Sequence, residues 1–327
     1  MKTARIIQIQ QHGGPEVMRV AQVDVADPAP GEVQIRQKAI GLNFIDIYCR
    51  TGLYPHDLPH GLGFEASGVV EAVGAGVTHV RAGDRVAYGQ GPIGAYADLR
   101  NVPADRVVRV PEGVGFDQAA ALMLKGLTVQ YLFRQTYRLK GSETILFHAA
   151  AGGVGLIACQ WAKALGVRLI GTASSPEKAA LARRHGAWEV IDYSREDVAA
   201  RVLELTGGQK VPVVYDGVGK DTWATSLDCL QTRGLMVSFG NASGPVEGVN
   251  LGILATKGSL YVTRPILATH VATAQAMQSA AAEVFDLVTA GKLDIVIGQR
   301  FALEDAAQAH EALKSRRTTG ATVLTLD

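Results

Sequence analysis

The chain has 327 residues, of which 47% are hydrophobic and 19% are charged, and its formal net charge is +1. This composition is typical of a globular protein of about two domains, and the balanced charge disfavours binding to nucleic acid or to acidic membranes. The three cysteines, Cys49, Cys159 and Cys229, are far apart and odd in number. They predict neither a disulfide framework nor a cysteine zinc site, and they fit a reducing cytoplasm.

The amino-terminal sequence MKTARIIQIQ enters an alternating strand pattern at once and lacks the long apolar core of a signal peptide. No run of about eighteen apolar residues occurs, so no membrane-spanning helix is expected. We therefore expect a cytoplasmic protein without a membrane partner.

Residues 1 to about 124 are predicted to form short β-strands. Turns containing glycine and proline, such as DPAPGE and AGDRV, separate these strands. This pattern indicates a compact, barrel-like β domain. The predicted strands are residues 4–10, 33–40, 66–73, 85–88 and 96–101.

From about Asp117 the hydrophobic period becomes that of a helix. Residues 116–135 are predicted to be helical, with an interruption near Gly126. Six β-prone segments then alternate with segments that can supply helices, which predicts a doubly wound parallel sheet with its ligand at the carboxyl ends of the strands. These strands are residues 144–148, 167–172, 190–192, 213–216, 235–239 and 259–262, and a helix over about 272–290 and a final strand over 322–326 follow.

The strand–turn–helix stretch over residues 143–163, whose helical pattern is closed by Gly166, carries the main functional signal. Its turn places Ala150, Gly152 and Gly155 at the spacing of the dinucleotide fingerprint, with alanine at the first position. Gly152 leaves the backbone open to a pyrophosphate, and Gly155 lets helix and strand approach closely. A bound phosphate would meet the free amides and the positive end of the helix. Any strand-to-helix turn favours glycine, so the spacing alone is weak evidence.

The end of the next strand indicates which dinucleotide would bind. An NAD enzyme places Asp or Glu on the ribose about twenty residues after the glycines. Ser174, Ser175 and Lys178 occupy this region, and Glu177 is expected in the first turn of the next helix. Hydroxyls and a lysine suit a 2′-phosphate, so NADPH is favoured over NADH. Ser175 could also cap that helix, with Pro176 at its first position, and both interpretations can hold.

The same stretch resembles, position by position, the signature of the quinone oxidoreductase (zeta-crystallin) family of medium-chain dehydrogenases/reductases. Similar segments, including GLNFIDIY, KGLT, VVYDGVG, SFGNASG and SRRTTG, extend the resemblance over essentially the whole chain. It implies an α/β fold, with a Rossmann doubly wound parallel sheet over residues 125–265. A β-rich, GroES-like barrel catalytic domain is expected from residues 1–124 and 266–327. The matching signature residues are Ser142, Glu143, Leu146, Ala150, Ala151, Gly152, Gly153, Gly155, Gln160 and Lys163.

Zinc alcohol dehydrogenases share this fold and bind their catalytic zinc through a cysteine and a histidine. The matching positions here hold Asn43 and Phe64, neither of which is a favoured zinc ligand. The resemblance therefore implies a zinc-independent reductase with no bound metal. Without a Lewis acid, the expected acceptor is a quinone or an electron-poor enone, which accepts hydride without such help. The residues leave open whether reducing equivalents move as a hydride or singly.

The resemblance places Asn43, Asp46, Tyr48 and Tyr54 beside the nicotinamide and the acceptor, in a cleft between the domains. Asn43, Tyr48 and Tyr54 are expected to orient the substrate, and Asp46 is expected on the cofactor side. The tyrosines could stack on a quinone or donate a hydrogen bond, or they could be ordinary half-buried tyrosines. No obligate general acid is assigned.

The other predicted cofactor contacts also come from the resemblance. Lys125 is expected close to the cofactor, although it could be a surface lysine. Arg316 is expected at the adenine end, with Arg317 as the alternative, although Arg316 could be a solvated charge. The remaining predicted contacts are Thr128, Tyr131, Gly152, Gly153, Val154, Ser174, Ser175, Lys178, Tyr193, Val218, Phe239, Gly240 and Asn241.

The leading hypothesis is an NADPH-dependent quinone reductase, and the alternative is an NADPH-dependent alkenal or enone double-bond reductase. A third possibility is a crystallin-like protein that binds NADPH and has a structural or RNA-binding role. The net charge of +1 gives RNA binding little support. The resemblance also implies a homodimer, for which the apolar segment 260–262 is the expected pairing edge.

Overall fold

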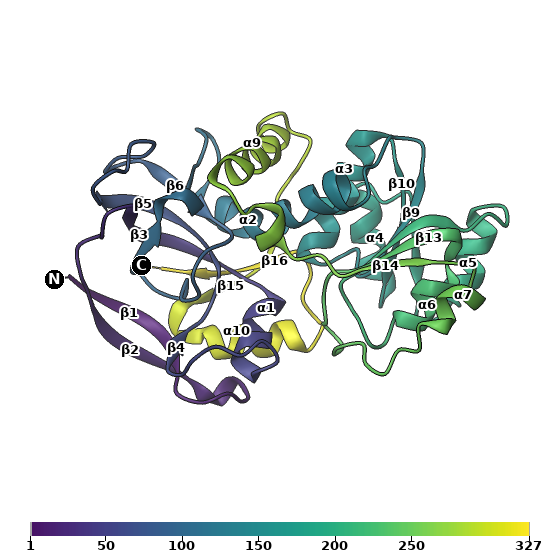
Figure 1. Cartoon of the computed structure of the whole chain (residues 1–327), viewed down its shortest axis with the longest axis horizontal. Helices are drawn as coiled ribbons and strands as arrows, with labels where there is room; N and C mark the ends of the chain where they lie inside the picture. Colours follow the sequence, from purple (N-terminus) through teal and green to yellow (C-terminus); the bar gives the residue numbers. More distant parts are fainter. Residues whose placement is uncertain (1, 327) are drawn as a thin grey trace. The chain divides into compact units, whose positions relative to one another are not determined.

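The computed structural model describes residues 2–326, so residues 1 and 327, which the predicted domain bounds include, lie outside the described range. The chain forms two compact units (Figure 1). The first consists of Met1–Thr128, Val271–Gly291 and Ile295–Asp327, and the second of Val129–His270 and Lys292–Asp294. These bounds lie near the predicted domain bounds, which themselves stay a prediction.

Within the described residues, the first unit contains two β-sheets. The smaller has the order β2-β1-β4 and the larger the order β15-β16-β3-β5-β6-β8, with β7 paired to β3. Adjacent strands are antiparallel except β15 and β16. The strands are β1 (Lys2–Ile9), β2 (Met18–Val25), β3 (Glu32–Leu42), β4 (His60–Gly61), β5 (Glu65–Val73), β6 (Arg85–Tyr88), β7 (Leu99–Pro103), β8 (Val108–Arg109), β15 (Ile297–Ala302) and β16 (Ala321–Thr325).

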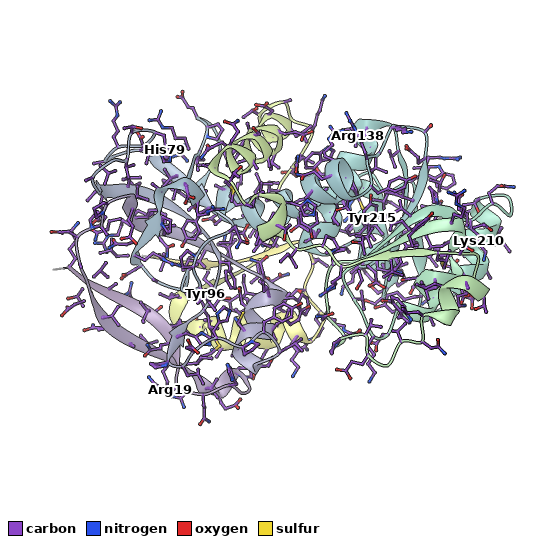
Figure 2. The ribbon with its side chains drawn as sticks, in the orientation of Figure 1. Arg19, His79, Tyr96, Arg138, Lys210 and Tyr215 are labelled. Atoms are coloured by element: carbon purple, nitrogen blue, oxygen red, sulfur yellow. The ribbon has the colours of Figure 1, made fainter. Side chains whose placement is uncertain are left out.

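The inward-facing side chains of these strands share one core, and β3 is buried over most of its length. The core includes Ile7, Ile35, Val70 and Tyr96, each at most 2% exposed, and Figure 2 labels Tyr96. The sequence analysis did not predict β2, although Ala21, Val23 and Val25 alternate with polar residues, and only Met18 of this strand is buried. The helices of this unit are α1 (Phe44–Thr51), α9 (Ala274–Thr289) and α10 (Ala306–Lys314).

The described part of the second unit contains a six-stranded parallel sheet of order β11-β10-β9-β12-β13-β14. This order confirms the predicted doubly wound sheet, whose ligand edge lies at the carboxyl ends of the strands. The strands are β9 (Thr144–Phe147), β10 (Arg168–Ala173), β11 (Glu189–Asp192), β12 (Val211–Asp216), β13 (Leu230–Ser238) and β14 (Tyr261–Thr263). The helices are α3 (Gly153–Leu165), α4 (Pro176–Arg184), α5 (Val198–Leu205), α6 (Trp223–Asp228), α7 (Gly252–Thr256) and α8 (Leu267–His270).

Helix α2 (Phe116–Tyr131) runs through Gly126 without a break, so the predicted interruption is wrong. A Cβ atom at Gly126 would lie 2.7 Å from Cγ1 of Val284 in α9 and 2.9 Å from Cδ1 of Leu122. The glycine therefore allows close packing of α9 on α2 and does not end the helix. A π-helical turn, Leu132–Thr136, continues α2.

The helix ends in the second unit confirm the local sequence signals. Helix α3 ends at Gly166, which has a φ of 75°. Helix α4 begins after Ser175, whose hydroxyl accepts a hydrogen bond from the backbone N–H of Lys178 at 3.3 Å, and Pro176 is its first residue. Among residues 2–326, no helix combines the length and the apolar character needed to cross a bilayer.

Candidate functional site

The turn between β9 and α3 is the predicted phosphate-binding element. Gly152 is the N-cap of α3 and supplies no side chain to the first amides of the helix, which have no partners within it. A Cβ at Gly155 would lie only 2.4 Å from the carbonyl oxygen of Ala149, so this glycine is required where α3 meets the turn. The amides that begin with Gly153 and Val154 therefore face an open helix end, which fits the pyrophosphate of a dinucleotide.

The end of β10 gathers residues predicted for the adenine end. The backbone N–H of Tyr193 donates to the carbonyl of Ala173 at 3.1 Å, which brings the residue after β11 beside Ser174 and Ser175. Lys178 lies in the first turn of α4, where partial burial lowers its pKa. Tyr193 is 48% exposed. Hydroxyls, an ammonium group and an aromatic face at one sheet edge fit an adenosine that carries a 2′-phosphate.

The turns after β12 and β13 pack against each other. Asp216 accepts hydrogen bonds from the backbone N–H groups of Val218 at 2.7 Å and Gly219 at 3.0 Å. A Cβ at Gly240 would lie 2.3 Å from the carbonyl oxygen of Gly217, so the second turn requires glycine there. The structure thus brings together four predicted contacts, namely Val218, Phe239, Gly240 and Asn241.

Arg264, which the sequence analysis did not identify, joins the segment after β14 to the turn after β13. The guanidinium of Arg264 donates to the carbonyls of Ser238 at 2.9 Å and Gly240 at 3.0 Å. Tyr131 stacks on His270 with ring centroids 4.5 Å apart, and its burial raises the pKa of its hydroxyl while Arg264 opposes that rise. A lone arginine after an edge strand gives no sequence signal for such a contact.

In the first unit, Asn43 lies at the amino end of α1 and Lys125 lies in α2. The side-chain amide of Asn43 donates to Oε2 of Glu65 at 2.8 Å, and the ammonium of Lys125 reaches the same oxygen at 2.9 Å. Lys125 is only 4% exposed, so its interpretation as a surface lysine is wrong. Thr128, one turn later, donates its hydroxyl to the carbonyl of Leu124 at 2.7 Å.

Glu65 is a residue that the sequence analysis missed. Its carboxylate is fully buried and also accepts the backbone N–H of Leu124 at 2.6 Å, so it binds both α1 and α2. The sequence does carry a signal for Glu65, namely an acidic residue in a buried strand. Such a residue needs a cation or hydrogen-bond donors as partners. Removing such a carboxylate would leave the buried Lys125 unpaired.

Asp46 lies in a second buried chain of polar groups. Its Oδ2 accepts hydrogen bonds from the backbone N–H of Asn43 and the hydroxyl of Tyr96, both at 2.9 Å, while its Oδ1 has no partner among the described residues. Burial raises the pKa of Asp46 to about 7. The Tyr96 hydroxyl also contacts Nε2 of His310 at 2.9 Å, and Nδ1 of His310 faces Arg50 at 3.2 Å. Burial, together with Arg50, lowers the pKa of His310 to about 3.

Tyr48 and Tyr54 form one aromatic pair at the carboxyl end of α1. Their ring centroids are 5.3 Å apart in an edge-to-face arrangement, and the backbone N–H of Tyr54 donates to the carbonyl of Tyr48 at 3.1 Å. Tyr48 is buried and Tyr54 is half-buried. Their role in substrate orientation stays a prediction, as does the cofactor contact of Arg316, an exposed residue of the first unit.

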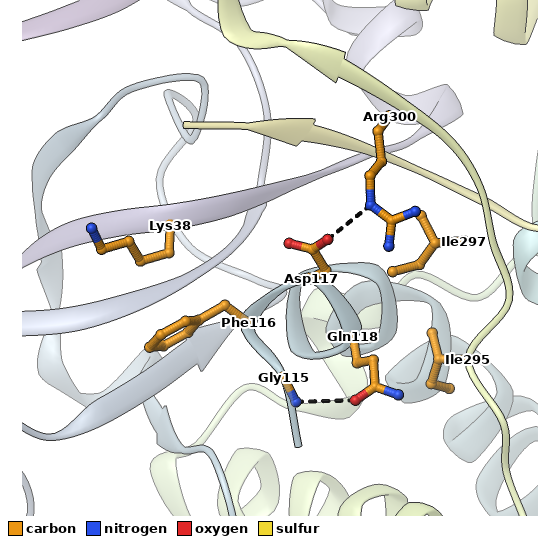
Figure 3. Close-up of a pocket in the computed structure, with 8 residues that line it drawn as sticks. All are labelled: Lys38, Gly115, Phe116, Asp117, Gln118, Ile295, Ile297 and Arg300. Carbon is orange, nitrogen blue, oxygen red and sulfur yellow. Dashed lines mark hydrogen bonds and ion pairs between the residues drawn. The ribbon is translucent and has the colours of Figure 1, made fainter. Parts of the chain in front are cut away.

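A separate pocket of about 590 Å³ lies in the first unit (Figure 3). Arg300 in its wall is paired with Asp117 at 2.9 Å, and Gln118 accepts the backbone N–H of Gly115 at 3.0 Å. None of the predicted site residues lines this pocket. Its lining residues are Lys38, Gly115, Phe116, Asp117, Gln118, Ile295, Ile297 and Arg300.

The positions that hold zinc ligands in zinc alcohol dehydrogenases have other roles here. Asn43 is hydrogen-bonded to Glu65, and Phe64 is buried. Among residues 2–326, no group of three or more His, Cys, Asp or Glu side chains is arranged to hold a metal ion. Zinc independence itself stays a prediction.

Two family models match the chain. Residues 29–112 match the alcohol dehydrogenase GroES-like domain, and residues 153–283 match the model named zinc-binding dehydrogenase. The first match confirms the predicted GroES-like fold of the β-rich part.

Curated proteins and solved structures match over nearly the full length. A quinone oxidoreductase of Pseudomonas aeruginosa is 64% identical over 98% of this chain and 99% of the relative. A 2-haloacrylate reductase of a Burkholderia species is 43% identical over 97% of each chain. The crystal structure of Escherichia coli quinone oxidoreductase complexed with NADPH has a TM-score of 0.97 and 55% identity, and the match covers 99% of this chain and 100% of that one.

Proposed function

Because the chain belongs to the quinone oxidoreductase family of medium-chain dehydrogenases/reductases, we propose that it is an NADPH-dependent quinone reductase. The full-length similarity to proteins named quinone oxidoreductases carries this proposal. The NADPH complex of the Escherichia coli relative supports the choice of cofactor. The hydroxyls and the lysine at the end of β10 support it independently.

NADPH supplies the reducing equivalents when it is bound. In our proposal, the free amides of α3 hold its pyrophosphate, while Ser174, Ser175, Lys178 and Tyr193 hold the adenosine and its 2′-phosphate. The turns after β12 and β13 border the nicotinamide half, where Asp216 and Arg264 hold the backbone in place. Asp46, Lys125 and Arg316 are proposed to contribute from the first unit.

The acceptor is proposed to be a quinone that Asn43, Tyr48 and Tyr54 orient. Edge-to-face tyrosines can contact a flat ring, and their hydroxyls can donate hydrogen bonds to it. The buried Lys125 ammonium has hydrogens beyond the one that meets Glu65, and it is the donor proposed to stabilise negative charge as it develops on the acceptor. Polarisation by zinc has no part in this proposal, because neither Asn43 nor Phe64 is a favoured zinc ligand.

Steady-state oxidation of NADPH and NADH, with 1,4-benzoquinone and a simple enone as acceptors, tests the proposal. We expect the highest kcat/KM for NADPH with the quinone. Turnover of NADH as efficient as that of NADPH would reject the assignment of the 2′-phosphate site. The absence of turnover with both acceptors, combined with tight NADPH binding, would instead favour the non-catalytic, crystallin-like role.

A reductase of electron-poor double bonds is the second candidate. The 43% identity to a 2-haloacrylate reductase favours it, because a haloacrylate contains an activated carbon–carbon double bond. A higher kcat/KM for the enone than for the quinone would keep the cofactor assignment and replace the acceptor.

We also propose that the protein is a cytoplasmic homodimer that pairs through β14. This strand lies at the edge of the described parallel sheet. Tyr261 is 53% exposed and Val262 is 39% exposed, so an apolar edge is open to a second chain.

A further inference from the structure

A buried polar chain within the second unit links two turns of the proposed cofactor site. His148 follows β9 directly, Thr172 lies in β10, Ser226 lies in α6 and Asp216 ends β12. Each of these four side chains is at most 3% exposed. Polar groups buried this deeply require hydrogen-bond partners, and each of these side chains has them.

The partners fix the direction of every hydrogen bond in this chain. Ser226 donates its hydrogen to Oδ2 of Asp216 at 2.8 Å, so at 3.0 Å it can only accept from Nε2 of His148. The His148 ring therefore carries its proton on Nε2. Its Nδ1 accepts the hydroxyl of Thr172 at 3.1 Å. Burial lowers the pKa of His148, in agreement with a neutral ring.

The buried polar chain ends at backbone N–H groups, one in the turn at Ala149 and two in the turn at Val218. At one end, Thr172 accepts the N–H of Ala149 at 3.2 Å. At the other end, Oδ1 of Asp216 accepts the N–H groups of Val218 and Gly219. A backbone amide can only donate, and four donors surround the carboxylate, since the hydroxyl of Thr222 also donates to its Oδ2 at 2.6 Å.

The turn at Ala149 has an unfavourable backbone conformation, and the buried polar chain stabilises it. Ala149 has a φ of 56°, a left-handed conformation that is unfavourable for alanine. Gly152 follows in the same turn and donates its backbone N–H to the carbonyl of Ala149 at 3.0 Å. The conformation of Ala149 therefore affects where the open end of α3 points.

We propose that His148 is a positioning residue that holds the phosphate turn and the turn at Val218 in the arrangement that NADPH requires. It acts through Thr172 on one side and through Ser226 and Asp216 on the other. A neutral imidazole suits this role because it accepts at one ring nitrogen and donates at the other. The inference rests on the proposed function, since it assumes that these two turns bind NADPH.

A double-mutant cycle on the neighbours of His148 tests the proposal. Thr172→Val removes one hydroxyl at constant shape, and Ser226→Ala removes the other. We expect each variant to bind NADPH about tenfold more weakly, because each leaves a buried partner unsatisfied. We expect the double variant to lose about tenfold as well, because either change already breaks the one connection through His148. Fluorescence titration gives the four dissociation constants, including that of the wild type.

Tyr215→Phe is the matched control, and Figure 2 labels this residue in the second unit. It removes one buried hydroxyl of β12, which donates to the carbonyl of Leu132 at 3.2 Å. This hydroxyl takes no part in the buried polar chain around His148. We expect a lower Tm for this control but an unchanged affinity for NADPH. The inference is overturned if Ser226→Ala behaves in the same way or if the losses in the cycle are additive. If the wild type itself fails to bind NADPH, the proposed function is overturned and the inference with it.

A measurement on the wild type covers the case in which the variants do not fold. Long-range ¹H–¹⁵N spectra of the histidine rings report the tautomer, and the signal that is lost in His148→Gln identifies His148. A proton on Nε2 is expected at neutral pH. A proton on Nδ1 would reverse the direction of the hydrogen bonds and overturn the inference.

Discussion

Lys178 occupies the region in which an NAD enzyme would hold a carboxylate on the ribose. We expect Lys178→Ala to raise the KM for NADPH about tenfold, because it removes a charge-assisted hydrogen bond to the 2′-phosphate. The KM for NADH should not change. Lys140→Ala is a suitable control, because this exposed lysine precedes β9, at the amino ends of the parallel strands, whereas Lys178 follows the carboxyl end of β10. Equal losses for the two cofactors would show that Lys178 does not contact the phosphate.

The carboxyl group of Asp46 makes stability depend on pH. Its pKa is raised to about 7 in the folded protein from an ordinary value of 3.8. Between these values the unfolded chain has released the proton that the folded chain retains, so each pH unit of increase costs the folded state about 1.4 kcal/mol. The loss begins near the ordinary value and is complete above the folded pKa.

Asp46→Asn removes this ionisation while keeping an oxygen for the two donors that Asp46 binds. We expect the variant to gain stability over the wild type as the pH rises from about 4 to about 7, with a constant difference above that range. Urea denaturation of both proteins over this range measures the difference. A difference that does not change with pH would mean that Asp46 ionises normally in the folded state.

Helix α3 depends on two glycines for different reasons. A Cβ at Gly155 would lie 2.4 Å from the Ala149 carbonyl oxygen, whereas a Cβ at Gly152 would lie 3.3 Å from the same atom. Gly152 also has a φ of −80°, which alanine adopts readily. Gly155 therefore allows close packing of α3 against the turn, and Gly152 is proposed to leave room for the phosphate.

We expect Gly155→Ala to lower the free energy of unfolding by about 1–3 kcal/mol through overpacking against the backbone of the turn. Gly152→Ala should keep nearly wild-type stability and bind NADPH about tenfold more weakly, since its methyl group would narrow the approach to the helix amides. Chemical denaturation and NADPH titration separate the two effects. Wild-type affinity in Gly152→Ala would argue against a pyrophosphate at this helix end.

At the scale of the whole molecule, β14 leaves apolar side chains exposed at a sheet edge. We expect the wild type to be a dimer in light scattering at micromolar concentration and Val262→Lys to be a monomer, because a charge opposes strand pairing. Leu203→Lys, at a 42% exposed residue of α5, is the control and should stay dimeric. A monomeric wild type would reject the proposed assembly.

The proposed absence of catalytic zinc can also be tested on the whole protein. We expect metal analysis to find much less than one zinc per chain, and treatment with a chelator should leave quinone reduction unchanged. The reason is that Asn43 and Phe64 replace a thiolate and an imidazole. Stoichiometric zinc that supports turnover would contradict this expectation.

The amino-acid sequence by itself determined the features that depend on neighbouring residues. It predicted the parallel strands, the glycine turn before α3, the end of α3 at Gly166 and the Ser175 cap, because apolar periodicity and turn chemistry act over a few residues. It also predicted an interruption at Gly126 that does not occur, because a glycine required for packing and one that breaks a helix are alike in sequence.

Only the tertiary structure decided how the polar groups behind the site are paired. Asn43 and Lys125 meet at Glu65 although they come from different helices, and Arg50 meets His310 across 260 positions of sequence. The partners of His148 are likewise brought to it by two other elements of the second unit. Burial in a low-dielectric interior makes such pairing obligatory, but which groups meet depends on how distant segments pack, and no local pattern records that.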